Sequence, residues 1–84
     1  MYSVSLAESA KRELREIDPR VGKRIVAKLH LLESNPRPPG IKKLADEDNV
    51  WRLRVGDYRV IYSIFDSSRE VVVTMIKHRS KAYR

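Results

Sequence analysis

A chain of 84 residues, with 42% apolar and 35% charged residues, has room for one globular domain spanning 1–84 and for one hydrophobic core. The absence of cysteine excludes disulfides and thiolate metal sites, and two histidines alone do not build a zinc site. The net charge of +7 favours a polyanionic partner, above all nucleic acid, with a merely solvated basic surface as the alternative.

Neither a membrane span nor a targeting segment is evident in the sequence. The longest apolar run, "VVVTMI" at 71–76, is too short to cross a bilayer. The N-terminal stretch "MYSVSLAESAKREL" has no apolar core region and no small-residue cleavage site. We therefore expect a cytoplasmic protein that makes no membrane contact.

The first half of the chain predicts a strand and two helices. "YSVSL" at 2–6 alternates apolar and polar residues, as a short strand does. Ser5 and Glu8 have the spacing of a capping box for the first helix. Asp18 and Pro19 suit the N-cap and first position of a second helix, and Asn35-Pro36 ends it. The apolar stripes of the two helices are Ala7, Ala10, Leu14 and Ile17, then Val21, Ile25, Leu29 and Leu32.

The second half predicts a sheet. Three strands follow the rigid loop "NPRPPG", with the ranges 50–55, 58–65 and 70–77. Gly56-Asp57 fits a two-residue type II′ turn, and "DSSR" at 66–69 joins the next pair of strands. The order strand, helix, helix, strand, strand, strand (β-α-α-β-β-β) predicts an α+β domain. We expect an antiparallel sheet with a helical hairpin packed on one face.

The tight turn fixes the register of the first hairpin, so that Val55 pairs with Tyr58 and Arg54 with Arg59. The apolar face, which must receive the helices, then carries Trp51, Leu53, Val55, Tyr58, Val60, Tyr62 and Ile64. The other face carries Arg52, Arg54, Arg59, Ile61 and Ser63. Opposed like charges destabilise a sheet, so this face suits a bound anion; a simply solvated face is the alternative interpretation.

Strict alternation extends this assignment to the last strand. If "DSSR" is a four-residue loop, Phe65 pairs with Glu70. The residues expected on the core face are then Val71, Val73, Met75 and Lys77, and those expected on the arginine face are Thr74, Ile76 and His78.

The C-terminal stretch "IKHRSKAYR" at 76–84 brings further polar groups to the hairpin end of the sheet. His78 titrates near neutral pH, Arg79 is a permanent cation, and Tyr83 donates, accepts or stacks. RNA cleavage by an internal 2′-hydroxyl needs two proton transfers and fixed cations around the phosphorane. With the three arginines of the hairpin, the stretch predicts an RNA phosphate site. We expect further RNA contacts from Lys77, Lys81 and Arg84.

Two stretches, "WRLRVGDYRVIY" at 51–62 and "KHRSKAY" at 77–83, resemble the RelE/ParE superfamily of type II toxin–antitoxin toxins, most of all its RelE-like branch. The resemblance covers nearly the whole chain and implies a microbial-ribonuclease-like α+β fold. It also implies an mRNA endonuclease that acts in the ribosomal A site, for which we expect neither metal nor cofactor. The implied partners are the ribosome, mRNA and a cognate RelB-like antitoxin, through which the complex would contact operator DNA.

The resemblance also suggests roles for individual residues. Arg52 and Arg54 match the basic strand pair of the family, and Arg59 matches the arginine of its "YR" strand. His78 matches the histidine of members with an "HR" ending. Arg79 and Tyr83 match the arginine and tyrosine that flank the scissile phosphate. Some family members carry lysines where this chain has Arg52 and Arg54, and arginine does not act as a base. Proton transfer is therefore expected from His78 or Tyr83, in either order. Lys77 ranks lower because alternation points it to the core.

Two other functions are compatible with the fold. A ParE-like inhibitor of DNA gyrase needs a binding surface but no phosphate site, and a non-catalytic module would act only in autorepression. The His78–Arg79–Tyr83 ending favours the nuclease. Trp51 is predicted to lie in the core by alternation rather than to stack on a base, and His30 to be an ordinary surface or rim residue.

Overall fold

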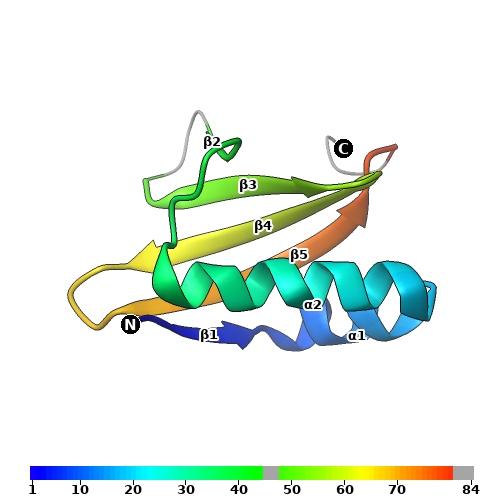
Figure 1. Cartoon of the computed structure of the whole chain (residues 1–84), viewed down its shortest axis with the longest axis horizontal. Coiled ribbons are helices and arrows are strands. Elements are labelled where there is room, and N and C mark those ends of the chain that lie inside the picture. The colour runs from blue at the N-terminus through cyan, green and yellow to red at the C-terminus, as the bar shows by residue number, and fades with distance from the viewer. Residues whose placement is uncertain (45–47, 81–84) are drawn as a thin grey trace.

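Two helices pack on a five-stranded sheet in the computed structural model, which describes residues 1–44 and 48–80 (Figure 1). The helices are α1 (Glu8–Glu16) and α2 (Pro19–Ser34). The strands are β1 (Ser3–Leu6), β2 (Lys42–Lys43), β3 (Val50–Val55), β4 (Tyr58–Phe65) and β5 (Glu70–His78), in the sheet order β1-β5-β4-β3-β2. The predicted α+β class is confirmed. Neither helix is long and apolar enough to cross a membrane within the described ranges.

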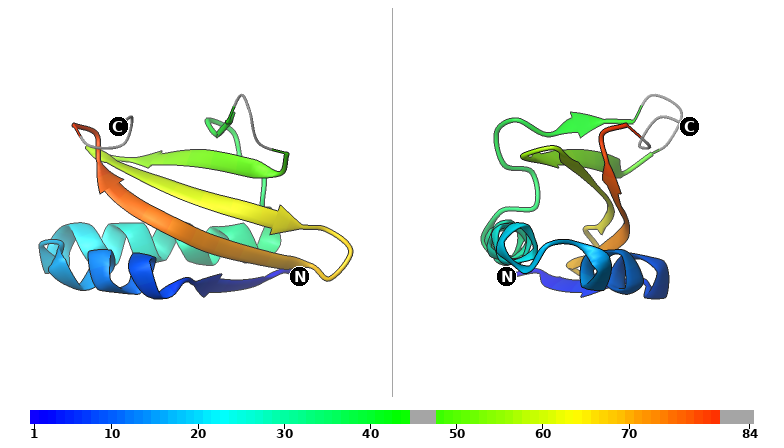
Figure 2. Two further views of the ribbon diagram at one scale, coloured as in Figure 1. Left: turned by 180° about the vertical axis from the view of Figure 1, so that it is seen from behind. Right: turned by 90° about the vertical axis from the view of Figure 1, so that its right-hand side faces the viewer.

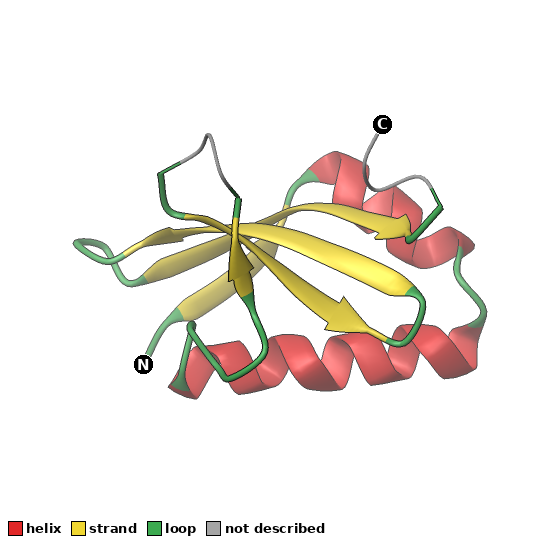
Figure 3. Cartoon of the chain, turned by 90° about the horizontal axis from the view of Figure 1, so that it is seen from above, coloured by secondary structure: helices red, strands yellow, loops and turns green. Residues whose placement is uncertain are grey.

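The sheet differs from the prediction at both edges. Strand β1 joins β5 in parallel, whereas the other neighbours are antiparallel, so the sheet is mixed (Figure 3). No hairpin connects β1 to β5, and nothing local therefore imposes an antiparallel pairing. Strand β2 was not predicted, because two residues are too few for an alternating pattern to show.

The start of α2 was predicted correctly and the start of α1 was not. Asp18 is the N-cap of α2, with its Oδ1 accepting from the Arg20 amide at 2.9 Å, and Pro19 is the first helical residue. The capping box predicted for α1 is wrong: the N-cap is Ala7, which makes no side-chain bond. Ser5 lies within β1, where it pairs with Val72, and therefore precedes the N-cap position of the helix.

The core lies between the helices and one side of the sheet (Figure 2). Ala10 and Ile17 of α1 are buried there, as are Ile25, Leu29 and Leu32 of α2. Seven buried strand residues lie on the predicted core face, namely Leu53, Val55, Val60, Tyr62, Ile64, Val71 and Val73. Ile61, predicted on the arginine face, is also buried, at 7% exposed. Burying one such aliphatic side chain stabilises the fold by about 1.5–3 kcal/mol. The opposite side of the sheet, called the open face below, carries no helix among the described residues.

A β-bulge at Thr74 overturns the prediction for the end of β5. Ile61 pairs with Met75 but Tyr62 pairs with Val73, which leaves Thr74 as an extra residue. One inserted residue reverses the alternation beyond it. Met75 is therefore 43% exposed rather than in the core, and Ile76, predicted on the arginine face, is 2% exposed in the core.

Candidate functional site

The hairpin of β3 and β4 has the predicted register. Gly56 adopts a φ of 58°, the left-handed value that the turn needs and that glycine tolerates best. Val55 pairs with Tyr58, and Arg54 lies directly opposite Arg59 on the open face. The turn therefore brings two guanidinium groups of the same strand pair to one end of the sheet.

Arg59 is a buried cation, and part of its guanidinium has no acceptor among the residues that the structure describes. Its side chain is 6% exposed, and its Nε and Nη1 have no hydrogen-bond acceptor within residues 1–44 and 48–80. Burial lowers the pKa of Arg59, as do the positive charges of Arg54, Arg52 and Arg79; Asp57 opposes the shift. A buried donor left without an acceptor destabilises a fold. A bound anion would supply both the missing acceptor and the missing charge.

Arg79 directly follows β5 and lies beside the β3–β4 turn, at the same end of the sheet as Arg54 and Arg59. Its amide donates to the carbonyl oxygen of Asp57 at 2.7 Å, and its Nε lies 4.0 Å from Asp57 Oδ1. The chain leaving β5 is thus held against the hairpin turn. Because Arg79 contributes to the pKa shift of Arg59, its charge acts on the same place. These charges form an arginine cluster, which consists of Arg52, Arg54, Arg59 and Arg79.

Lys77 lies on the opposite side of the sheet from the one predicted. It pairs with Arg59, so the register places it on the open face rather than in the core. Its ammonium nevertheless forms an ion pair with Glu13 of α1. Glu13 also accepts from the Ile76 amide at 2.8 Å, along the part of β5 that β1 does not cover. This carboxylate was not singled out in the sequence, where it is one of several charges on α1.

His78 lies on the helix side of the sheet, and the prediction that it shares the arginine face is wrong. It pairs with Tyr58, and the two rings meet edge to face with centroids 5.4 Å apart. The reason is the extra residue at Thr74, which exchanges the sides of His78 and Lys77. The groove around the imidazole is lined by Glu13, Glu16, Ile17, Tyr58, Ile76 and Lys77.

Other residues complete the comparison with the sequence predictions. Tyr83, Lys81 and Arg84 lie outside the described residues, so their predicted positions are not tested. Lys42 was missed: as the partner of Arg52 in the sheet, it adds a further cation to the open face. Its strand is too short to leave a signal in the sequence.

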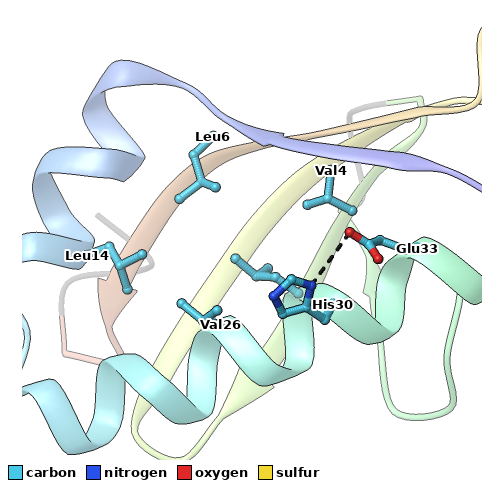
Figure 4. Close-up of a pocket in the computed structure, with 7 residues that line it drawn as sticks. Val4, Leu6, Leu14, Val26, His30 and Glu33 are labelled. Carbon is cyan, nitrogen blue, oxygen red and sulfur yellow. Dashed lines mark ion pairs between the residues drawn. The ribbon is translucent and has the colours of Figure 1, made fainter.

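Trp51 and His30 lie where the sequence predicted them, in contact with the core and at the surface. Trp51 packs against the core, with the Arg37 guanidinium 5.6 Å from its ring. His30 has a 70% exposed side chain and lies 3.6 Å from Glu33, at the rim of a groove between β1 and the helices (Figure 4). The remaining residues lining this groove are Val4, Leu6, Leu14, Val26 and Leu29. These five side chains are apolar and offer no group that binds a phosphate.

The arginine cluster has a defined chemical capacity. Fixed cations hold a phosphate and stabilise the additional negative charge of a phosphorane. They do not transfer protons at physiological pH, because a guanidinium does not titrate there. The cluster can therefore bind and polarise a phosphodiester, while acid and base catalysis need another group.

Several known proteins are similar to this chain in sequence and fold. Residues 4–83 match the family model described as the ParE toxin of the type II toxin–antitoxin system parDE. The chain is 28% identical to the putative toxin RelE1 of Methanocaldococcus jannaschii over 99% of this chain and 96% of that protein. It is 31% identical to toxin RelE of Mycobacterium tuberculosis over 99% of this chain and 87% of that protein.

Two solved structures have the same fold and comparable length. The archaeal RelE–RelB complex of Pyrococcus horikoshii matches with a TM-score of 0.85 and 27% identity, covering 96% of this chain and 98% of that one. The toxin–antitoxin complex RelBE2 of Mycobacterium tuberculosis matches with a TM-score of 0.82 and 30% identity, covering 93% and 98%.

Proposed function

Because the chain belongs to the RelE/ParE family of type II toxin–antitoxin toxins, we propose that it is a ribosome-dependent mRNA endoribonuclease. It would cleave mRNA in the A site and so inhibit translation. The observation that carries the proposal is Arg59, which is buried beside three other arginines with two nitrogens lacking an acceptor within the described chain. A scissile phosphate supplies the acceptor and the charge that this arrangement lacks.

The proposed reaction is attack of the RNA 2′-hydroxyl on the neighbouring phosphorus. The 5′ oxygen leaves, and a 2′,3′-cyclic phosphate remains on the upstream fragment. Arg54, Arg59 and Arg79 would stabilise the negative charge that develops on the phosphorane, and one such donor typically contributes roughly 10²–10³ in rate. The 2′ proton must be removed and the leaving oxygen protonated by groups other than these arginines.

The proposed partner is a RelB-like antitoxin. The P. horikoshii relative was solved as a RelE–RelB complex and the M. tuberculosis relative as a toxin–antitoxin complex. By analogy, a cognate antitoxin would cover this chain, neutralise it and make any contact with operator DNA. Its place of action would be the cytoplasm, where ribosomes translate mRNA.

A second candidate function is inhibition of DNA gyrase, because the matched family model describes ParE toxins. That activity requires a binding surface but no site for a scissile phosphate. The burial of Arg59 among like charges costs stability without benefit in a gyrase inhibitor, and this favours the nuclease. The same argument weighs against a module that acts only in autorepression.

Primer extension on a reporter mRNA, after induction of the toxin, tests the proposal. The nuclease should produce new 5′ ends within codons and stop translation. Induction of an Arg59→Ala variant, compared at equal protein level, should give far fewer such ends. A DNA-damage response with intact mRNA would instead support the gyrase inhibitor.

A further inference from the structure

The structure assigns His78 a positioning role: we propose that its imidazole fixes the chain at residues 79–80 from the helix side of the sheet and so holds Arg79 at the phosphate site. The proposal rests on the proposed function and assigns no proton transfer to His78. His78, which the sequence motif suggests as the acid or base, would then affect cleavage only by holding the backbone that carries Arg79.

The first argument is the side of the sheet on which the ring lies. His78 pairs with Tyr58, whose side chain packs against the core. Arg59, the next residue along β4, belongs to the open face. Neighbouring residues of a strand point to opposite sides. The imidazole is therefore separated from the buried guanidinium of Arg59 by the sheet itself.

The second argument is the set of bonds that the ring makes. His78 Nδ1 accepts a hydrogen bond from the Ser80 amide at 3.3 Å and lies 3.0 Å from Ser80 Oγ. In the neutral ring the proton is then on Nε2, because Nδ1 is the acceptor. The Arg79 amide, in turn, donates to the Asp57 carbonyl oxygen at 2.7 Å. Two successive amides are thus fixed, one by the hairpin turn and the next by His78.

The third argument is the charge around the ring. The titratable groups that share its groove are Glu13 and Glu16 of α1, Tyr58 of β4 and Lys77 of β5. Glu13 is engaged by Lys77 and by the Ile76 amide. A groove with two carboxylates suits a phosphodiester poorly, whereas the arginine cluster lies on the other face. Substrate phosphate and imidazole are thus on different sides of the sheet.

Two substitutions separate positioning from proton transfer. In His78→Asn, the side-chain oxygen can accept from the amide two residues on, as in an Asx turn, but it cannot transfer a proton. In His78→Phe, a ring still packs against Tyr58, but the acceptor is lost. Both variants are compared with the parent in single-turnover cleavage of mRNA on programmed ribosomes.

The proposal predicts that His78→Asn keeps the rate within about 10-fold of the parent, less than the roughly 10²–10⁴ that a lost acid or base costs. His78→Phe should lose about 10²-fold, the cost of a group misplaced by about 1 Å. Equal losses of 10²-fold or more in both variants, or no loss in either, would overturn the proposal.

Hydrogen exchange of the Ser80 amide gives a second measurement that needs no ribosome and no cleavage. The amide should be protected in the parent and in His78→Asn, and should exchange faster in His78→Phe. An unprotected Ser80 amide in the parent would overturn the positioning role. A parent that does not cleave mRNA at all would overturn the proposed function, and the amide protection would still decide whether His78 fixes this turn.

Discussion

Arg54 and Arg59 lie directly opposite each other across the β3–β4 hairpin, and Arg59 is buried there without an acceptor for two of its nitrogens among the described residues. Such a pair is unfavourable in a free protein, because opposed like charges destabilise a sheet and a buried donor needs an acceptor. The arrangement becomes favourable when an anion binds between the guanidinium groups. Stability and function are therefore expected to oppose each other at this site.

The first prediction concerns the cost of the arginine pair to the stability of the free protein. Arg59→Met retains an unbranched side chain and removes the buried charge, so the melting temperature should rise. Arg54→Ala should leave stability unchanged or raise it by at most about 1 kcal/mol, since it relieves the repulsion. Thermal unfolding followed by circular dichroism measures both. Lys28→Ala, a charge removal on an exposed position of α2, is the matched control. A marked loss of stability in Arg59→Met would mean that this cation already has a stabilising partner.

The second prediction concerns acid stability at the other end of the sheet. Arg37 donates to both oxygens of Asp66, at 3.1 and 2.8 Å, and the Tyr2 hydroxyl donates at 2.6 Å. Mainly through the Arg37 bond, and then that from Tyr2, the pKa of Asp66 is lowered from 3.8 to about 2. A carboxyl with a lowered folded-state pKa stabilises the protein above its ordinary pKa, and this contribution is lost as the pH falls towards 2.

Urea unfolding as a function of pH measures this contribution. Asp66→Asn should be less stable than the parent near neutral pH, and the difference should shrink between pH 3.8 and 2. Tyr2→Phe, which removes one of the two donors and leaves the charge, should show a smaller effect in the same window. A difference between parent and Asp66→Asn that does not change with pH would contradict the assignment.

The Gly56-Asp57 turn explains why one half of the site could be derived from the sequence. A two-residue loop leaves no freedom in the register, so the opposition of Arg54 and Arg59 follows from counting outward from the turn. The core face of β3 and β4 follows in the same way, because the two strands pair without a bulge from Val50 opposite Ser63 to Val55 opposite Tyr58.

The bulge at Thr74 explains why the other half of the site could not be derived from the sequence. The bulge adds one residue without glycine or any other marker, and Met75 and Ile76 are adjacent apolar residues that fit either side of the sheet. Lys77 and His78 therefore lie on the opposite sides from those predicted. The parallel pairing of β1 with β5 could not be predicted either, because it depends on how the two helices pack and not on the local sequence of β1.

The third prediction concerns the antitoxin. A RelB-like protein that binds only the folded toxin should increase the free energy of unfolding by an amount that grows with the logarithm of its concentration, about 2.7 kcal/mol at 100 times the dissociation constant, and so raise the melting temperature. Mixing the purified chain with the protein encoded beside it, followed by thermal unfolding, measures the gain. No gain at saturating concentration would contradict the proposed partner.

The fourth prediction concerns the ends of the cleaved RNA. Attack by the 2′-hydroxyl leaves a 2′,3′-cyclic phosphate and a 5′-hydroxyl, so the downstream fragment should be labelled by polynucleotide kinase without prior dephosphorylation. Because a nucleophile within the substrate needs no metal-bound water, activity should persist in EDTA when polyamines keep the ribosomes intact. A 5′-phosphate on the downstream fragment would show that a different nucleophile attacks.

The most direct test of the arginine cluster is the rate of a single cleavage event on programmed ribosomes at saturating toxin. Arg54→Ala and Arg59→Met should each cleave roughly 10²–10³ times more slowly than the parent, at every pH, because each removes a charge that stabilises the phosphorane and arginine does not titrate. Lys28→Ala should cleave at the parent rate. If Arg54→Ala and Arg59→Met also cleave at the parent rate, the open face is a solvated surface and the phosphate site lies elsewhere.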